Sequence, residues 1–424
     1  MSATTVPAKA KAKGPGLRQR MSDFADRHRS TSVLIGVGLV AAALPVIVLL
    51  PPFNGFSGQS VWMDGFTNAG VFILLALGLN VVVGLSGLLD LGYAAFFAIG
   101  AYTYAYGASP FSGVHAPFLA MLVLGALTAA TFGVLLGAPT LRLRGDYLAI
   151  VTLGFGEIVP IVFLNLDTWT QGTNGISGIF RPEPLPLIGE FTAVTPYAYM
   201  VVMLFIVTIA MALLYRLQDS RVGRAWNAIR EDELAAAANG INTVTTKLLA
   251  FALGATTAGL AGVFSASKLT IVGPDQFYFQ VSFTILAMVI LGGMGNIWGV
   301  AAGAFVVYLL QSVLLKQLNS FKEALHLPAL DLGPVHFDIN AINFTDYSFL
   351  LFGFALVLMM LFRPEGLFPS QRRRRELHIG EELAGPADIV PVEDPGIVGA
   401  LGETPGAEEL TGEDAGPGAP GHDR

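Results

Sequence analysis

The chain contains no cysteine and few charged residues. Only 13% of its 424 residues are charged, whereas about 25% of a typical soluble domain is charged. The missing cysteine excludes disulfides and thiolate metal sites, although it leaves the cellular compartment open. No glycine is followed by lysine anywhere, so the chain also lacks the G-x-x-x-x-G-K-[ST] phosphate loop. ATP binding through such a loop is therefore excluded for this chain.

No pattern in the chain indicates catalysis. The H-E-x-x-H motif and other closely paired histidines are absent, and no nucleophile, base and metal-ligand set is clustered in the sequence. We therefore expect no catalytic residues, no metal site and no cofactor. No nucleic-acid partner is expected either.

Long apolar runs are abundant instead, and 53% of the residues are hydrophobic. A helix that spans a bilayer needs about 20 mostly apolar residues, and glycine, of which there are 49, is more frequent in membrane helices than in soluble ones. We predict an all-α polytopic membrane protein with about ten transmembrane helices. The expected spans lie near residues 31–50, 68–83, 88–107, 117–137, 147–166, 196–217, 248–266, 282–293, 299–315 and 347–362. A cleaved signal peptide is the alternative interpretation of the first run.

The basic residues predict the orientation of these spans. With ten spans and a cytoplasmic N-terminus, 20 of the 24 lysines and arginines fall in cytoplasmic segments. This favours a multi-pass protein of the cytoplasmic membrane with both ends inside. A basic arm (residues 1–30) and a tail (residues 369–424) flank a transmembrane domain at residues 31–368, and both are predicted to be disordered. The tail begins with basic residues 372–375, which suit anionic membrane lipid, and then becomes acidic.

A charged segment, AIREDELAAAANGI, lies in the cytoplasmic loop at about residues 218–246. Five apolar side chains recur at helical spacing, which predicts one amphipathic helix with Ser220 as its N-cap and Gly240 at its C′ position. The five are Trp226, Ile229, Leu234, Ala237 and Ile241. Such a helix either lies on lipid headgroups or docks a cytoplasmic partner.

Two acids, Asp90 and Glu157, fall inside the predicted spans. A carboxylate at mid-bilayer costs about 2.5–3.5 kcal/mol on insertion scales, so it normally faces a cavity or a partner. The glycines before Asp90 predict a break in its helix. We list Asp90 and Glu157, with Asn80 and Tyr93, as candidates to line a pathway. The alternatives are an interhelical hydrogen bond for Glu157 and a position at the cytoplasmic interface for Asp90.

The predicted outer loop at residues 172–179 reads GTNGISGI. Its glycines and Asn174 permit tight turns. Thr173, Asn174 and Gly175 are candidates for contact with an external substrate-binding protein, and an ordinary surface loop is the alternative.

Several blocks of the chain resemble a known family. Glu233-Leu234-Ala235-Ala236 followed by Gly240 resembles the EAA loop of ABC-importer permeases. The region between residues 69 and 368 is similar to branched-chain amino acid permeases of the LivM type, in the blocks GLSGLLDLGYAAFFAIGAYTYA, LRGDYLAIVTLGFGEIV, GTNGISGI, ILGGMGNIWGVAAGA and LFRPEGLF, and around the charged segment. The resemblance implies that the charged segment is a coupling helix for a separate ATPase. Its residues are Arg230, Glu231, Asp232, Glu233, Ala235, Ala236 and Gly240.

The resemblance also implies an assembly and a function. The expected partners are two ATP-binding subunits, a second homologous permease subunit and an extracytoplasmic substrate-binding protein. The chain is then the permease subunit of an importer for Leu, Ile or Val, and not itself an enzyme. A urea or short-chain amide permease of the same family is the first alternative. An ion-coupled secondary transporter, which would use intramembrane charges, is the more distant one.

Overall fold

A computed structural model describes residues 43, 59–141, 143, 145–185, 189–192, 196–315, 317–318, 330–332, 335–337, 347–362 and 366–367. The predicted basic arm, nearly all of the predicted span at residues 31–50, the basic residues 372–375 and the acidic tail lie outside the described residues.

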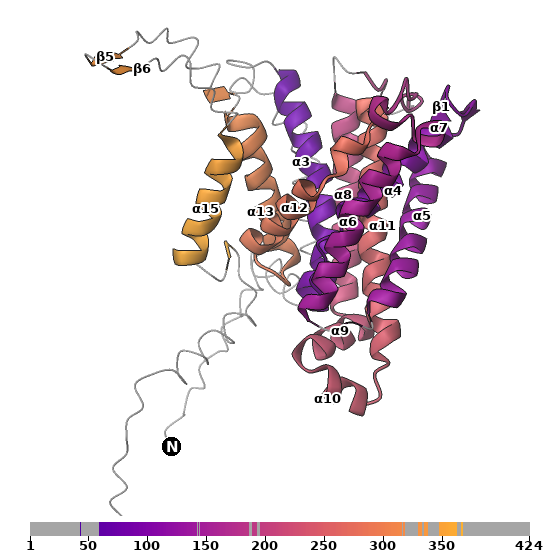
Figure 1. Cartoon of the computed structure of the whole chain (residues 1–424), viewed down its shortest axis with the longest axis vertical. Helices are drawn as coiled ribbons and strands as arrows, with labels where there is room; N and C mark the ends of the chain where they lie inside the picture. Colours follow the sequence, from indigo (N-terminus) through magenta and orange to yellow (C-terminus); the bar gives the residue numbers. More distant parts are fainter. Residues whose placement is uncertain are drawn as a thin grey trace, which may run out of the picture. The chain divides into compact units, whose positions relative to one another are not determined.

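Helices make up most of the described chain (Figure 1). The α-helices are α3 (Gln59–Leu79), α4 (Ala94–Gly107), α5 (Phe118–Thr140), α6 (Asp146–Asn165), α7 (Asp167–Thr170), α8 (Tyr197–Gln218), α9 (Arg221–Glu231), α10 (Glu233–Ala238), α11 (Thr243–Leu269), α12 (Phe279–Gly292), α13 (Ile297–Tyr308) and α15 (Ser348–Phe362). The π- and 3-10 segments are η2 (Asn80–Leu85), η3 (Gly172–Asn174), η4 (Pro274–Phe277) and η5 (Leu309–Leu314). Three short antiparallel pairs join β1 (Ala108–Ser109) to β2 (Val114–His115), β3 (Ile176–Ser177) to β4 (Ile271–Val272), and β5 (Leu330–Leu332) to β6 (Val335–Phe337).

Six helical segments of the described residues are long and apolar enough to cross a membrane. The predicted all-α polytopic class is confirmed, whereas the number of ten spans stays a prediction. Helix α3 starts at Gln59, before the predicted start at residue 68, because Asp64 interrupts the apolar run but not the helix. Of the two acids predicted inside spans, Glu157 lies in one of these six segments and Asp90 lies outside them. Asp64, Asp146 and Asp275 also lie within the segments, so the prediction of only two acids is wrong.

The outer surface of α5 is apolar along its whole length. Leu119, Leu127 and Leu135 are each 60% exposed. A contiguous apolar face of this size is not stable in water, and it suits the hydrocarbon of a bilayer. The fold therefore turns apolar side chains outward as well as inward, as a membrane protein requires.

Helix α11 forms the centre of the bundle and packs against α5, α4 and α3. Its 27 residues correspond to about 40 Å of helix, which exceeds the roughly 30 Å of hydrocarbon in a bilayer. The backbones of α5 and α11 approach closely at Gly259, where an added Cβ would lie 2.4 Å from Gly125 O. Small residues permit such close packing between membrane helices. Helix α11 thus connects the two ends of the bundle directly.

Two interruptions in the helices lie next to each other. Residues 86–93 separate η2 from α4, which confirms the predicted break before Asp90. Residues 293–296 form the turn between α12 and α13, with Gly295 in the left-handed region at φ 82°. The side chain of Asn80 joins the two, because its Oδ1 accepts a hydrogen bond from Gly295 N at 2.8 Å. Helix α9 contacts η2 at this end of the bundle.

Candidate functional site

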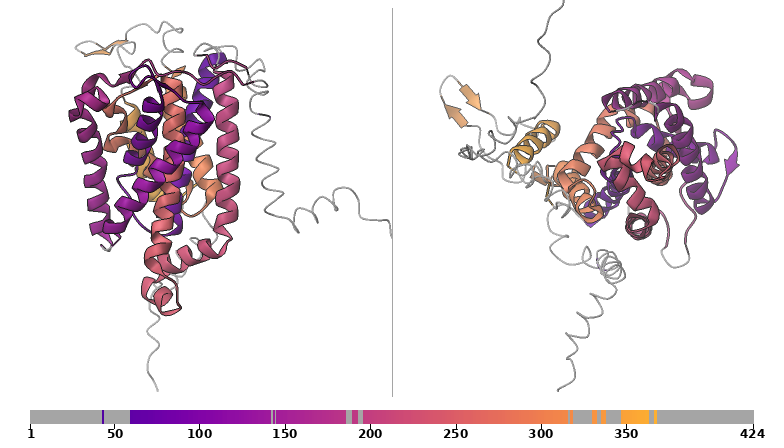
Figure 2. Two further views of the ribbon diagram at one scale, coloured as in Figure 1. Left: turned by 90° about the vertical axis from the view of Figure 1, so that its right-hand side faces the viewer. Right: turned by 90° about the horizontal axis from the view of Figure 1, so that it is seen from below.

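Helices α9 and α10 project beyond the ends of the long helices, as two views show (Figures 1 and 2). The Ser220 hydroxyl caps α9 by accepting from Gly223 N at 3.3 Å, as the sequence predicts. Trp226 is fully buried, and its indole Nε1 donates to Thr246 O at 2.7 Å. A buried tryptophan with a satisfied N–H fixes α9 against the first turn of α11.

The predicted single amphipathic helix is in fact two helices. Asp232 has extended backbone angles, φ −153° and ψ 110°, and its carboxylate caps α10 by accepting from Leu234 N and Ala235 N. Aspartate competes for backbone N–H groups in this way, so it ends one helix and starts the next. The expected apolar stripe therefore stops at Ile229. Leu234, predicted on the same face, is 68% exposed.

Glu233 binds the next membrane helix. Its Oε1 lies 2.6 Å from Lys247 Nζ in α11, and the two side chains are 33% and 7% exposed. Lys247 is thus a buried cation whose charge is compensated by Glu233. The glutamate of the EAA-like motif fastens α10 to α11 while keeping part of its carboxylate in contact with solvent.

The exposed surface of α10 and the turn that follows it form a small, mostly apolar tip, which we call the docking tip. It consists of Leu234, Ala235, Ala237, Ala238 and Gly240, all exposed. Gly240 has φ 84°, and the bonds Ile241 N to Ala236 O and Gly240 N to Ala237 O close a Schellman motif. This confirms the predicted C′ glycine. Contiguous exposed apolar residues of this kind are typical of surfaces that bind other proteins.

The other predicted coupling residues take different positions. Glu231 and Asp232 are exposed beside the docking tip, whereas Ala236 is buried. Arg230 turns away from the tip and donates from Nη1 to Gly84 O in η2. The seven residues that the resemblance groups together thus face three directions: the solvent, α11 and the end of η2.

Two of the four predicted pathway residues, Asp90 and Tyr93, lie in the break at residues 86–93, and a third, Asn80, begins the π-helical segment η2 that leads into it. Asn80, Asp90 and Tyr93 are each no more than 2% exposed. The Tyr93 hydroxyl lies 2.8 Å from Gly254 O and 3.1 Å from Thr257 Oγ1, so it fixes α4 to α11. Asp90 Oδ1 accepts from Gly92 N, while its Oδ2 has no hydrogen-bond partner within the described residues.

Asp90 also lines a cavity of about 700 Å³ between α4, α5, α6 and α11. The other lining side chains are mainly apolar, and Phe96, Phe155 and Phe251 are among them. Thr152, which accepts from Leu91 N, is a polar exception. This cavity therefore combines an apolar wall with one carboxylate, an arrangement typical of sites for small amphipathic molecules.

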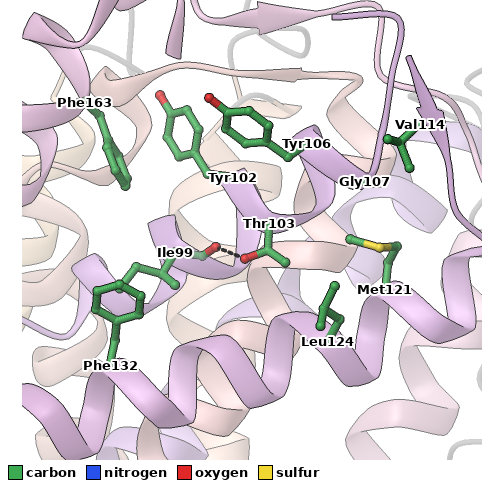
Figure 3. Close-up of a pocket in the computed structure, with 10 residues that line it drawn as sticks. All are labelled: Ile99, Tyr102, Thr103, Tyr106, Gly107, Val114, Met121, Leu124, Phe132 and Phe163. Carbon is green, nitrogen blue, oxygen red and sulfur yellow. Dashed lines mark hydrogen bonds between the residues drawn. The ribbon is translucent and has the colours of Figure 1, made fainter. Parts of the chain in front are cut away.

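A second cavity, of about 510 Å³, lies toward the other end of α4 (Figure 3). Tyr102, Tyr106 and Phe163 line it on one side, and Met121 and Leu124 of α5 on another. The buried Tyr102 hydroxyl has no hydrogen-bond partner among the described residues. Helix α4 is thus bordered by an apolar cavity at each end.

Glu157 stands apart from the other three candidates. It lies on α6, half-buried, and it is not part of the wall of the Asp90 cavity. At 100° per residue, Glu157 lies about 100–160° around α6 from Val151, Phe155 and Ile158, which do line that cavity. Its role on the pathway stays a prediction.

The loop at residues 172–179 lies at the end of α11 that is far from α9. Strand β3 of this loop pairs with β4, two residues after α11 ends at Leu269. Thr173 and Asn174 are exposed, whereas Gly175 is buried at φ 66°, where a Cβ would lie 2.5 Å from Val272 O. Only the first two are therefore accessible to a partner.

Sequence reasoning missed two polar links. Lys268 in the last turn of α11 pairs with Asp64 of α3 at 2.6 Å and donates to Asn68 Oδ1. The i, i+4 spacing of Asp64 and Asn68 was the available signal. Gln218, the last residue of α8, donates to Gly295 O at 3.1 Å. Nothing in the sequence around Gln218 indicates this long-range contact.

Comparison with known proteins identifies the family to which the chain belongs. The family model described as "Branched-chain amino acid transport system / permease component" matches residues 62–360. The chain belongs to this family. The match includes the docking tip, the break and both cavities of this permease. No group of three histidine, aspartate or glutamate side chains that could hold a metal occurs in its described residues.

Individual relatives give the same result. The high-affinity branched-chain amino acid transport system permease protein LivM of Salmonella typhimurium is 39% identical to this permease over 81% of the permease and 77% of the relative. The LivM protein of Escherichia coli is also 39% identical, with the same two shares. The autoinducer 2 import system permease protein LsrC of Yersinia pseudotuberculosis is 24% identical over 73% and 82%. No solved structure matches.

Proposed function

We propose that this permease is the transmembrane subunit of an ABC importer and that separate ATP-binding subunits drive it. The docking tip carries the proposal. It is exposed and largely apolar, and it is fastened to the central helix α11 through Trp226 and through the Glu233–Lys247 pair. A partner that moves the tip would therefore also pull on the helix that packs against α3, α4 and α5.

The need for a separate ATPase follows from the sequence. The chain has no phosphate loop, and no Gly-Lys dipeptide from which one could be built. We propose two ATP-binding subunits, one on this permease and one on a second homologous permease subunit. An exposed tip that only rested on lipid headgroups would be expected to turn a broad apolar face toward the bilayer. Here the broad apolar face of α9, which includes Trp226, is buried inside the protein and does not face lipid.

Exposed residues at the opposite end of the bundle are suitable for contact with an external partner. Thr173 and Asn174 are exposed there, next to the β3–β4 pair. We propose that they contact an extracytoplasmic substrate-binding protein and that the docking tip faces the cytoplasm. The excess of basic residues in the predicted inner segments supports the same orientation and placement in the cytoplasmic membrane.

The proposed substrates are leucine, isoleucine and valine. The two relatives that are 39% identical are named as permease proteins of branched-chain amino acid transport systems. The cavity at Asp90 suits an aliphatic ammonium compound, because its wall is apolar and one carboxylate oxygen has no partner among the described residues. Urea and short amides carry no ammonium group, so they gain much less from a carboxylate. We therefore propose Asp90 as a pathway residue.

Reconstituted transport tests this function. The permease would be placed in liposomes with its second permease subunit, the ATPases and a loaded binding protein, and uptake of labelled leucine, urea and acetamide would be compared. The proposal predicts leucine uptake that needs both the ATPases and ATP. Uptake driven by an ion gradient without ATPase subunits would indicate a secondary transporter. Uptake of urea or acetamide in preference to leucine would overturn the substrate class alone.

A further inference from the structure

The side chain of Arg230 occupies a slot built from three glycines of two distant segments. A Cβ added to Gly87 would lie 2.8 Å from Arg230 Cγ, and a Cβ added to Gly295 would lie 3.3 Å from Arg230 Nη1. The third glycine, Gly84, contributes its carbonyl oxygen, to which Arg230 donates. Any side chain at Gly87 or Gly295 would therefore narrow the slot, and both glycines have positive φ values as well.

The hydrogen bond to Gly84 is well suited to a cation. Gly84 lies in the last turn of η2, where carbonyl groups run out of helical partners and the helix dipole is negative. A charge-assisted bond from a guanidinium satisfies such a carbonyl, and it is stronger than a neutral bond. We expect lysine to replace arginine poorly here, because its flexible ammonium lacks the planar shape of the guanidinium that occupies the slot.

The slot also joins the two interruptions of the bundle. Asn80 Oδ1 accepts from Gly295 N at 2.8 Å, so η2 and the turn at residues 293–296 are connected beside Arg230. Gln218, the last residue of α8, lies three residues before α9 begins and donates to Gly295 O. The chain is therefore attached to the interruptions on both sides of α9, through Gln218 just before it and through Arg230 in its last turn.

We propose that Arg230 is the positioning residue that transmits movement of the docking tip to these two interruptions. This inference rests on the proposed function, because it assumes that a partner moves the tip. The break at residues 86–93 begins at the slot, continues through Asp90 and ends at Tyr93, which is bonded to α11. A displacement of Arg230 thus moves the segment that lines the Asp90 cavity.

The first test separates transmission from docking. In the reconstituted full complex, Arg230→Ala and Arg230→Lys are compared with Arg224→Ala. Arg224 is a control on the exposed side of the same helix, and its Nη1 donates to the nearby Asp219 O. Substituting a residue that couples two sites typically changes the strength of that coupling by about two- to thirtyfold. We expect Arg230→Ala to retain ATPase binding and ATP hydrolysis while leucine uptake per ATP falls by about that factor. Arg230→Lys is expected to rescue little, and Arg224→Ala to match the wild type.

Two results would overturn the proposal. One is an Arg230→Ala complex with the wild-type uptake per ATP. The other is a complex in which uptake falls only as much as ATPase binding, which would make Arg230 a docking or folding residue. Failure of the wild-type complex to use ATP at all would instead refute the proposed function.

The second test needs no change at Arg230. Because the chain has no cysteine, spin labels can be placed uniquely at Arg224→Cys on α9 and Leu89→Cys in the break, both exposed positions. If Arg230 links the two segments, the distance between the labels stays the same in the nucleotide-free and the ATP-trapped complex. Adding Arg230→Ala should then make that distance change or broaden on ATP binding. A distance that already changes with Arg230 present, or that is insensitive to its removal, contradicts the inference.

Discussion

The contact between Glu233 and Lys247 predicts an asymmetry between two substitutions. Glu233→Ala leaves the Lys247 ammonium buried, at 7% exposure, without its counter-charge. Lys247→Met leaves Glu233, which is 33% exposed and can turn toward solvent. Breaking a fully buried pair costs about 3–5 kcal/mol, and an exposed pair contributes about 0–1 kcal/mol. Since Glu233 is one-third exposed, we expect about 2 kcal/mol for Glu233→Ala and less than about 1 kcal/mol for Lys247→Met.

Hydrogen exchange measures this difference locally, because the pair holds α10 against α11. A loss of about 2 kcal/mol in the opening free energy accelerates amide exchange about thirtyfold in the affected helix. The amides of Ala236 to Ala238 should therefore exchange much faster in Glu233→Ala than in Lys247→Met. The double variant should behave like Lys247→Met, because it no longer contains a buried unpaired charge. Equal effects of the two single changes, adding up in the double variant, would refute the reasoning.

The same variants decide how Glu233 acts on the ATPase. If Glu233 only fixes α10, the double variant regains ATPase binding that Glu233→Ala loses. If the ATPase binds the Glu233 carboxylate directly, the double variant stays as weak as Glu233→Ala. A pull-down with the purified ATPase subunit distinguishes these outcomes.

Three further predictions concern single residues. Gly240→Pro requires a φ near −65° where the chain has 84°, and it removes the N–H that is bonded to Ala237 O. We therefore expect α10 to lose about 3 kcal/mol of local stability and ATPase binding, measured by pull-down, to fall. Normal binding and uptake would contradict this. Asp90→Asn should keep the complex assembled and lower leucine uptake by about tenfold, because the charge that faces the substrate ammonium is lost. Unchanged uptake would show that Asp90 does not line the pathway. Glu157→Gln, which preserves shape, should lower uptake about tenfold if Glu157 lines the path, and unchanged uptake would assign it to a hydrogen bond between helices.

Local signals in the sequence were sufficient for the helix ends. Ser220 and Gly240 act on backbone groups within a few residues, so their capping roles follow from residue type and position. The glycine-rich approach to Asp90 predicted the break for the same reason. The resemblance and the apolar runs together were enough to predict the class of fold.

Long-range contacts decided what the sequence did not show. Asp232 suits both a helix interior and an N-cap, and the pairing of Glu233 with Lys247 accompanies the second choice. The Arg230 slot combines Gly84 and Gly87 with Gly295, which are separated by about half of the chain. A grouping of neighbouring residues into one coupling motif therefore concealed that Arg230 and Glu233 face different parts of the bundle.

Cross-linking from the docking tip tests the central claim most directly. Leu234→Cys is the only thiol in the chain and is well exposed, so a photo-activated cross-linker can be attached there in the assembled complex. Asn174→Cys, at the opposite end, serves as the matched control. The account predicts that Leu234→Cys cross-links to an ATP-binding subunit and that Asn174→Cys does not. Cross-links from Leu234→Cys to lipid alone, with no ATPase product, would contradict it.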